Sequence, residues 1–399
     1  MVSSDTYSSY RYQSKAILRG QNKPRLCNKA LKTMESLSEV HDTAPSWNGV
    51  PQVRAEGSAW NIGLTHGRQI PSRIRTCIKN YERLFQETAE ADWEESVSRA
   101  MKYLPALEQN EPDLVEEMKG IAAGSGMAFE DILALNLRSE ISLTNFSDGC
   151  TSIVTKDETS GNTYVAQNWD WVGEAGMSTA FFDIQKTGAP RIRMLGEAGI
   201  VAKFGVNDFG VGICMNAIRC GTVNYAALPV HLAMRRVLEC RSFDEAYSLL
   251  SKKGVASCVN FAIADASGRF ATIECTPKGL APIFPEAGTS VTFHTNHLWS
   301  PDIPAGILDH PSRNSFTRLE RIRELSKSQK PDVEKIRLWM SDEHGTPVSI
   351  CRSTPSGSKG IERMETLATV IIDLQNCKAE VSLGKPSLSP PVLILEMND

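Results

Sequence analysis

The apolar residues of this chain follow one period before residue 150 and another after it. Across Ile70–Phe85 they recur every three or four positions, which is the spacing of one face of an amphipathic helix. Another helix is expected to begin at Pro112, because proline fits the first turn of a helix, and to stop at the glycines that follow it. The segment from about Pro51 to Asp148 is therefore predicted to be mainly helical.

After residue 150 the pattern changes to short apolar runs, separated by glycine, that are typical of strands. Thr151–Thr155 and Thr163–Ala166 flank a polar turn, so they predict a β-hairpin. Two helices are expected next, over Pro229–Cys240 and after the capping box Ser242–Glu245. This order of helices and strands predicts a layered α+β protein. Further strands are predicted at 192–195, 202–204, 210–215, 259–264, 270–275 and 291–294.

The composition is that of an ordinary globular protein. The 399 residues are enough to bury a core, and 41% hydrophobic and 23% charged residues are common values. The net charge of −4 gives no basic field, so no nucleic-acid partner is expected. No apolar run approaches the ~18 residues of a membrane span, and no signal-peptide core is present, so no membrane partner is expected.

The ten cysteines include no C-x-x-C pair, and the seven histidines show no zinc-like spacing with them. No metal site and no bound cofactor are therefore expected. Most cysteines lie in apolar runs and are predicted to be buried thiols in a reducing compartment, which indicates a cytoplasmic protein.

Residues 1–45 are rich in Ser, Lys, Arg, Gln and Asn and lack an apolar period, so they are predicted to form a flexible N-terminal extension. A transit peptide is the alternative interpretation of this basic start. Asp5 and the weak amphipathic pattern argue against that alternative.

The strongest chemical signal is the tripeptide Asp148-Gly149-Cys150 at the start of a predicted strand. A cysteine directly after an Asp-Gly step indicates a chain that cuts itself between Gly149 and Cys150. The cut would give Cys150 an α-amine beside its thiol, so one residue would carry both a nucleophile and a base. Thiols have a pKa near ~8.5 and α-amines near ~7.7–8.0, so both groups are poised close to working pH. Cys150 is therefore the candidate nucleophile of an acyl-transferring enzyme.

Five short motifs lie in order along the chain, at Asp148–Thr151, Gln167–Asp170, Glu197–Ile200 with Gly205–Asn207, His294–His297 and Ser349–Arg352. In this order, over about residues 52–390, they resemble the fungal acyl-CoA:isopenicillin N acyltransferase family of the N-terminal-nucleophile (Ntn) hydrolases. The resemblance implies a four-layer αββα sandwich of two antiparallel sheets between helices. It also implies an inactive precursor, cleaved into an α-chain (the extension 1–45 and a helical part 46–149) and a β-chain (150–399).

The remaining candidate residues take their roles from residue type and resemblance together. Asn296 alone would be interpreted as a turn residue, but the family's matching Asn stabilises the tetrahedral intermediate, which makes it the candidate oxyanion donor. Asp170 and Arg352 are expected to orient the new α-amine and shape the pocket, with a structural ion pair as the alternative. Trp169 and Trp171 are expected to line the substrate cleft, with core packing as the alternative.

The predicted function is acyl transfer from an acyl-CoA or an amide to a small amine through a Cys150 thioester, in fungal secondary metabolism. The expected partners are these small molecules and the two chains of the same precursor, with acyl-CoA as a co-substrate. The alternatives are an Ntn amidohydrolase that cleaves small amides or peptides and an unprocessed inactive homologue that acts as a binding protein. A further alternative is a papain-like protease that pairs Cys150 with His294 or His297.

Overall fold

The structure is a computed structural model, and it describes residues 41–142, 149–327 and 330–396. Residues 1–40 of the predicted extension and Asp148 of the predicted cleavage motif lie outside these ranges. The last residues of the predicted extension are hydrogen-bonded to the rest of the protein. The backbone N–H groups of Thr43 and Ala44 both donate to the carbonyl of Gln69, at 2.8 and 3.2 Å.

The segment before residue 143 folds mainly into helices, as its apolar period predicts. The helix expected to begin at Pro112 does so, and its cap is Gly126, whose φ of 72° lies in the left-handed region that favours glycine. Within the described residues no helix is long and apolar enough to cross a membrane. The elements of this segment are β1 (Ser46–Trp47), β2 (Val50–Gly57), α2 (Ala59–Gln69), α3 (Pro71–Thr88), α4 (Trp93–Met101), α5 (Leu104–Asn110), α6 (Pro112–Ser125), α7 (Phe129–Asn136) and α8 (Arg138–Ser142).

Strand β2 departs from the predicted helical pattern. Val53 and Ala55 are buried while Arg54 and Glu56 are exposed, so this stretch has a period of two residues. β2 pairs in parallel with a strand from the second part of the chain, β5 (Thr179–Lys186). The N-terminal segment is therefore not only helical. It also contributes strands to a sheet whose other strands follow residue 150.

The segment after residue 150 contains both predicted helices and most of the predicted strands; the strand expected at 202–204 begins only at Phe204, as β7. β3 and β4 form the expected antiparallel hairpin, with Lys156 opposite Thr163 at its turn. The side chain of Ser242 accepts the backbone N–H of Glu245, which is the expected cap of α10. The strands are β3 (Thr151–Lys156), β4 (Thr163–Val172), β5, β6 (Arg191–Glu197), β7 (Phe204–Asn207), β8 (Gly212–Ala217), β9 (Val259–Ala264), β10 (Phe270–Thr276), β11 (Gly279–Ile283), β12 (Val291–His294), β13 (Met364–Asp373), β14 (Lys378–Leu383) and β15 (Val392–Glu396). The helices are α9 (Val230–Leu238), α10 (Phe243–Lys253), α11 (Arg313–Lys327), α12 (Val333–Met340) and the short 3-10 turns η1 (Gly173–Ser178), η2 (Gly360–Glu362) and η3 (Pro386–Leu388).

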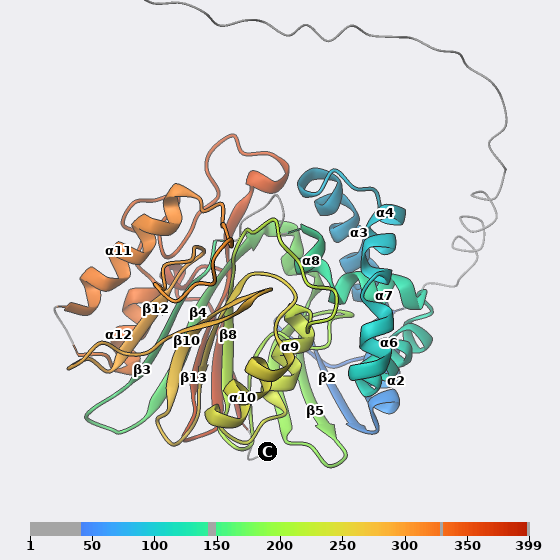
Figure 1. Cartoon of the computed structure of the whole chain (residues 1–399), viewed down its shortest axis with the longest axis horizontal. Coiled ribbons are helices and arrows are strands. Elements are labelled where there is room, and N and C mark those ends of the chain that lie inside the picture. The colour runs from blue at the N-terminus through green and yellow to red at the C-terminus, as the bar shows by residue number, and fades with distance from the viewer. Residues whose placement is uncertain (1–40, 143–148, 328–329, 397–399) are drawn as a thin grey trace, which may run out of the picture. The chain divides into compact units, whose positions relative to one another are not determined.

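Among the described residues the strands form two sheets that stack on each other. The larger sheet has the strand order β1-β2-β5-β6-β7-β8-β9-β10-β11, and the smaller has β12-β3-β4-β13-β14-β15. Helices α2 and α9 pack on the larger sheet, and α11 and α12 pack on the smaller one. Figure 1 shows α11 and α12 at the left, α2–α8 at the right and the strands between them. The predicted α+β fold, a four-layer αββα sandwich, is confirmed; its one parallel pair among the described strands is β2–β5.

Candidate active site

Cys150 lies at the start of β3, an inner strand of the smaller sheet with β12 on one side and β4 on the other. Side chains alternate along a strand, so Cys150 faces the same way as Ser152 and Val154. Val154 belongs to the core between the two sheets, whereas Ile153 belongs to the core under α11 and α12. The Cys150 side chain is therefore buried in the layer between the sheets.

Gly149, on the other side of the predicted cleavage point, is enclosed by two of the candidate residues. A Cβ atom placed on Gly149 would lie 2.8 Å from Nη1 of Arg352 and 2.9 Å from Cβ of Asp170, so no larger residue fits without a shift. Asp170 and Arg352 are both tied to Thr366. Its hydroxyl donates to Oδ1 of Asp170 at 2.7 Å and accepts the backbone N–H of Arg352 at 2.8 Å. The structure thus places Asp170 and Arg352 together, buried, against Gly149.

Arg318 of α11 holds the Cys150 side of the cleavage point. Its Nη1 donates to the carbonyl oxygen of Cys150 at 2.6 Å and to the hydroxyl of Thr151 at 3.0 Å. Its Nη2 donates to Oδ1 of Asn296 at 2.8 Å. Nδ2 of Asn296 donates in turn to the carbonyl of Ala217, the last residue of β8, at 2.9 Å. One buried guanidinium therefore connects the candidate nucleophile with the candidate oxyanion donor.

The pairing of β12 with β3 explains why Asn296 lies beside Cys150. His294 is opposite Ser152, the last pair of these antiparallel strands, so the residues just beyond it on both chains, Asn296 and Cys150, come close together. Asn296 binds the carbonyl of Ala217 in the larger sheet and Cys150 belongs to the core between the sheets, so both side chains reach that layer. Ser315 of α11 fixes the turn after β12, because its hydroxyl accepts the backbone N–H of Asn296 at 2.8 Å.

The two histidines considered for a protease mechanism have other partners. Nδ1 of His294 is 2.7 Å from the carbonyl of Thr295, and its Nε2 is 2.8 Å from a carboxylate oxygen of Glu274. Both ring nitrogens of His294 are therefore used to hold the turn. Burial, helped by nearby positive charges, lowers the pKa of His297 to about 4. A base of that pKa takes a proton from a thiol poorly.

The indole of Trp169 packs against a buried cation. The register of β3 with β4 places Trp169 beside Cys150, and both are buried. Nζ of Lys203 lies 3.2 Å from the centroid of this indole and 2.7 Å from a carboxylate oxygen of Glu197. Burial alone would raise the pKa of Glu197, but Lys203 and Arg138 lower it to about 2, so the carboxylate stays charged. Trp169 thus packs in a charged part of the core.

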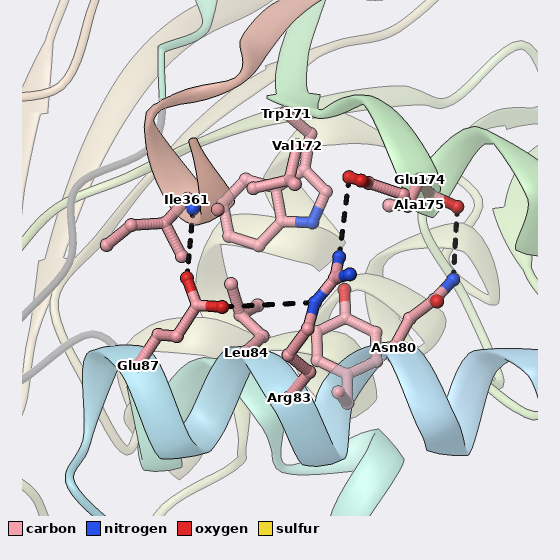
Figure 2. A pocket seen from close by; sticks show the side chains of 11 residues that line it. Asn80, Arg83, Leu84, Glu87, Trp171, Val172, Glu174, Ala175 and Ile361 are labelled. Carbon is pink, nitrogen blue, oxygen red and sulfur yellow. Dashed lines mark hydrogen bonds and ion pairs between the residues drawn. The ribbon is translucent and has the colours of Figure 1, made fainter. Parts of the chain in front are cut away.

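A small pocket borders Trp171, two positions further along β4 (Figure 2). Trp171 and Ile361 enclose it on one side and Leu84 of α3 on the other. Arg83 lies along the pocket and pairs with Glu174 at 3.4 Å, which joins α3 to the turn after β4. The enclosed volume is about 20 Å³, enough for about one water molecule. Of the two tryptophans, Trp171 lines this pocket and the other does not.

Arg318 and Ser315 belong to the site, yet no sequence motif identifies them. Their spacing does carry a signal. The buried face of α11 consists of residues spaced by three, one and three positions, namely Ser315, Arg318, Leu319 and Ile322. An arginine on such an apolar stripe is expected to have a buried partner, because burying an unpaired charge is costly. That signal could have marked Arg318 but not its partners.

The layered αββα fold, with a buried cysteine directly before an inner strand, agrees with the fold that the sequence resemblance implies. Residues 156–388, more than half of the chain, match the family described as acyl-coenzyme A:6-aminopenicillanic acid acyl-transferase, and the chain belongs to this family. It is accordingly an enzyme of acyl transfer or amide hydrolysis. The matched range begins just after Cys150 and contains Asp170, Asn296 and Arg352.

The chain is also similar to individual proteins. The 40 kDa form of acyl-coenzyme A:6-aminopenicillanic-acid-acyltransferase from Emericella nidulans is 29% identical over 338 residues, which is 84% of this chain and 93% of that protein. Penicillin V acylase from Agrobacterium tumefaciens has a TM-score of 0.40 and 15% identity, over 63% of this chain and 87% of that chain. A mutant conjugated bile acid hydrolase from Clostridium perfringens has a TM-score of 0.42 and 12% identity, over 62% and 92%.

Proposed function

We propose that this protein is made as an inactive precursor, cleaves itself between Gly149 and Cys150, and then works as an acyltransferase with Cys150 as its nucleophile. The observation that carries the proposal is the enclosure of this one peptide bond. Asp170 and Arg352 lie against Gly149, and Arg318 binds the carbonyl of Cys150. An intramolecular attack on a peptide bond requires such fixed geometry on both sides of it.

Maturation is proposed to begin with attack of the Cys150 thiol on the carbonyl carbon of Gly149. A C–S bond forms, the peptide C–N bond breaks and the nitrogen takes up a proton, which leaves a thioester. Water then hydrolyses this thioester, so Gly149 ends in a carboxylate and Cys150 has its thiol beside a new α-amine. Asp170 and Arg352 are the groups in place to hold this peptide first and the α-amine afterwards.

Turnover uses the same cysteine. The α-amine takes the proton of the thiol, and the thiolate attacks the acyl carbonyl of the donor. An amide N–H of Asn296 stabilises the oxyanion, and the leaving thiol departs with a proton. An amine then attacks the acyl-Cys150 thioester, which gives an amide and restores the thiol. Exchange of one thioester for another is nearly isoenergetic, so the step needs no ATP, and amide formation drives the reaction forward.

An acyl-CoA is the proposed donor and a small amine the proposed acceptor. The support is the family, whose description pairs acyl-coenzyme A with 6-aminopenicillanic acid, and the fungal relative that carries the same name. That relative is also the reason to propose a role in fungal secondary metabolism. The pocket beside Trp171 has room for about one water molecule, so the size of the acyl group is left to the test of acyl-CoA donors.

The test begins with the intact mass of the purified protein, which should show chains of 149 and 399 − 149 = 250 residues. The cut protein is then given acyl-CoA and a panel of amines, and released CoA and amide are followed together. Matching release of both supports a transferase, whereas steady CoA release without amide indicates a hydrolase. An uncut chain with neither product would overturn the proposal in favour of a binding protein.

A further inference from the structure

We propose that Arg318 is a positioning residue for acyl transfer, which holds the side-chain amide of Asn296 in the one orientation that serves the oxyanion. The inference rests on the proposed function, because it concerns turnover at Cys150. A residue of α11, far along the chain from Cys150, would thus set the geometry at the reaction centre.

The oxygen and the nitrogen of the Asn296 amide have different partners. Arginine has only hydrogen-bond donors, so the atom that receives Nη2 of Arg318 at 2.8 Å must be the oxygen. The amide nitrogen consequently points to the carbonyl of Ala217, at 2.9 Å. If the amide were turned over, two donors would meet at Arg318 and two acceptors at Ala217. Arg318 and Ala217 therefore select a single orientation of the amide.

This orientation leaves one amide N–H for the reaction. The nitrogen carries two hydrogens, of which one donates to Ala217 in the larger sheet. Ala217 lies across the layer between the sheets, into which the Cys150 side chain also points. The second N–H of Asn296 is therefore on the side where an oxyanion on the Cys150 adduct would form.

The guanidinium of Arg318 also makes the amide N–H of Asn296 a stronger hydrogen-bond donor. A hydrogen bond from a cation to the amide oxygen draws electron density from the nitrogen, so its N–H groups donate more strongly. Arg318 is 2% exposed, and water therefore screens the effect little. The same guanidinium binds the carbonyl of Cys150 at 2.6 Å, which fixes the backbone of the nucleophile relative to Asn296. Lysine cannot reproduce this, because it lacks the planar fork that reaches both partners.

The test is a double-mutant cycle on the processed enzyme, with kcat as the readout. Arg318→Met is expected to lower kcat by about 10-fold to 10²-fold with little change in KM, since it removes the orientation and polarisation of an oxyanion donor. In an Asn296→Ala background the same substitution should change kcat by less than about 3-fold, because the positioned group is gone. A full multiplicative loss in that background would overturn the proposal, because Arg318 would then act independently of Asn296.

Controls separate this role from folding and from the proposed function. Arg321→Met changes an arginine of the same helix whose partner is Asp342, at 2.7 Å, and should leave kcat unchanged. Arg318→Lys keeps the charge but is expected to lose several-fold in kcat; a kcat equal to that of the wild type would contradict the proposal. If both Arg318 variants stay uncut while the wild type is cut, the residue serves maturation and the proposal is wrong. An uncut wild type would instead refute the proposed function itself.

Discussion

The two sides of the Gly149–Cys150 bond are built from different parts of the chain. Gly149 lies against two charged side chains, Asp170 from β4 and Arg352. The hydroxyl of Thr366 in β13 links them, because it donates to Asp170 and accepts the backbone N–H of Arg352. Cys150 is held by Arg318 of α11, and its neighbour there is an amide from the turn after β12. The first side fits the making of a new N-terminus, and the second fits its use.

This difference teaches that the proposed cleavage and the proposed stabilisation of the oxyanion have separate supports. A charged pair against Gly149 is suited to hold a peptide and then a charged α-amine, because an opposite charge stabilises an ammonium group. An amide polarised by a cation is suited to a developing oxyanion. Substitutions on the two sides, such as those of Asp170 and Asn296, are therefore expected to fail at different steps.

The largest effect is expected for Cys150→Ala, which removes the group common to both sides. The chain should remain a single species of 399 residues by intact mass and show no acyl transfer. Cys377→Ala, in a half-buried cysteine on the tight turn between β13 and β14, is the matched control and should be cut as the wild type is. A cut Cys150→Ala chain would mean that another residue is the nucleophile.

The Gly149 side of the bond is tested by Asp170→Asn, which keeps the shape and an acceptor for Thr366 but removes the charge beside Gly149. Cleavage is expected to slow by about 10-fold or more, because a carboxylate beside the attacked peptide also stabilises the emerging ammonium group. A time course of intact mass after synthesis measures the rate. Cleavage at the wild-type rate would show that the charge on the Gly149 side does not serve maturation.

The fold was largely predictable because it follows from local patterns. The hairpin of β3 and β4 and the capped helix after Ser242 are encoded by alternation, turn residues and a cap within a few positions of each other. β2 was missed because Val50–Gly57 pairs with β5, more than 120 residues away, and the surrounding period is helical. A short strand that joins a distant sheet leaves only a weak local signal.

The candidate site was predictable only where motifs mark it. The motifs point to Asp170, Asn296 and Arg352, and the structure shows which side of the Gly149–Cys150 bond each one occupies. Arg318 was not singled out, because its partners Cys150 and Asn296 come from strands that only the folded chain brings to α11. Long-range hydrogen bonds of this kind have no counterpart in sequence spacing.

The Cys150 side of the bond is tested by Asn296→Ala. This variant should be cut normally yet lose about 10² in kcat, because an oxyanion donor is commonly worth that factor. Asn314→Ala is the matched control, since Asn314 also accepts from Arg318, at 3.2 Å, but lies on α11 itself. A failure of Asn296→Ala to be cut would break the proposed division between the two sides of the bond.

A smaller effect is expected for Trp171, the residue after Asp170 on β4. We propose that Trp171 lines the substrate cleft; Trp171→Phe keeps an aromatic ring but frees space, so bulkier acyl groups should gain several-fold in kcat/KM relative to small ones. The readout is a series of acyl-CoA donors of increasing size with one amine. Trp299→Phe, in a tryptophan that does not line the pocket beside Trp171, should leave the ranking of donors unchanged. An unchanged ranking for Trp171→Phe would show that the acyl group binds elsewhere.

The smallest effect, close to none, is expected for His297→Gln, and it decides which base serves Cys150. If the α-amine is the base, kcat/KM should rise with pH through ~7–8, where an α-amine loses its proton, and level off above. The pKa of His297 is lowered to about 4 by burial and by nearby positive charges, so it is already neutral throughout that rise. An imidazole base at this position would place the rise near pH 4 instead.

Glutamine can replace the hydrogen bond of His297 to Ser315, so the His297→Gln variant should fold, and its pH profile should match that of the wild type. A rise near pH 4 in the wild type that disappears in His297→Gln would restore the protease-like pairing of cysteine and histidine and remove the need for an N-terminal amine.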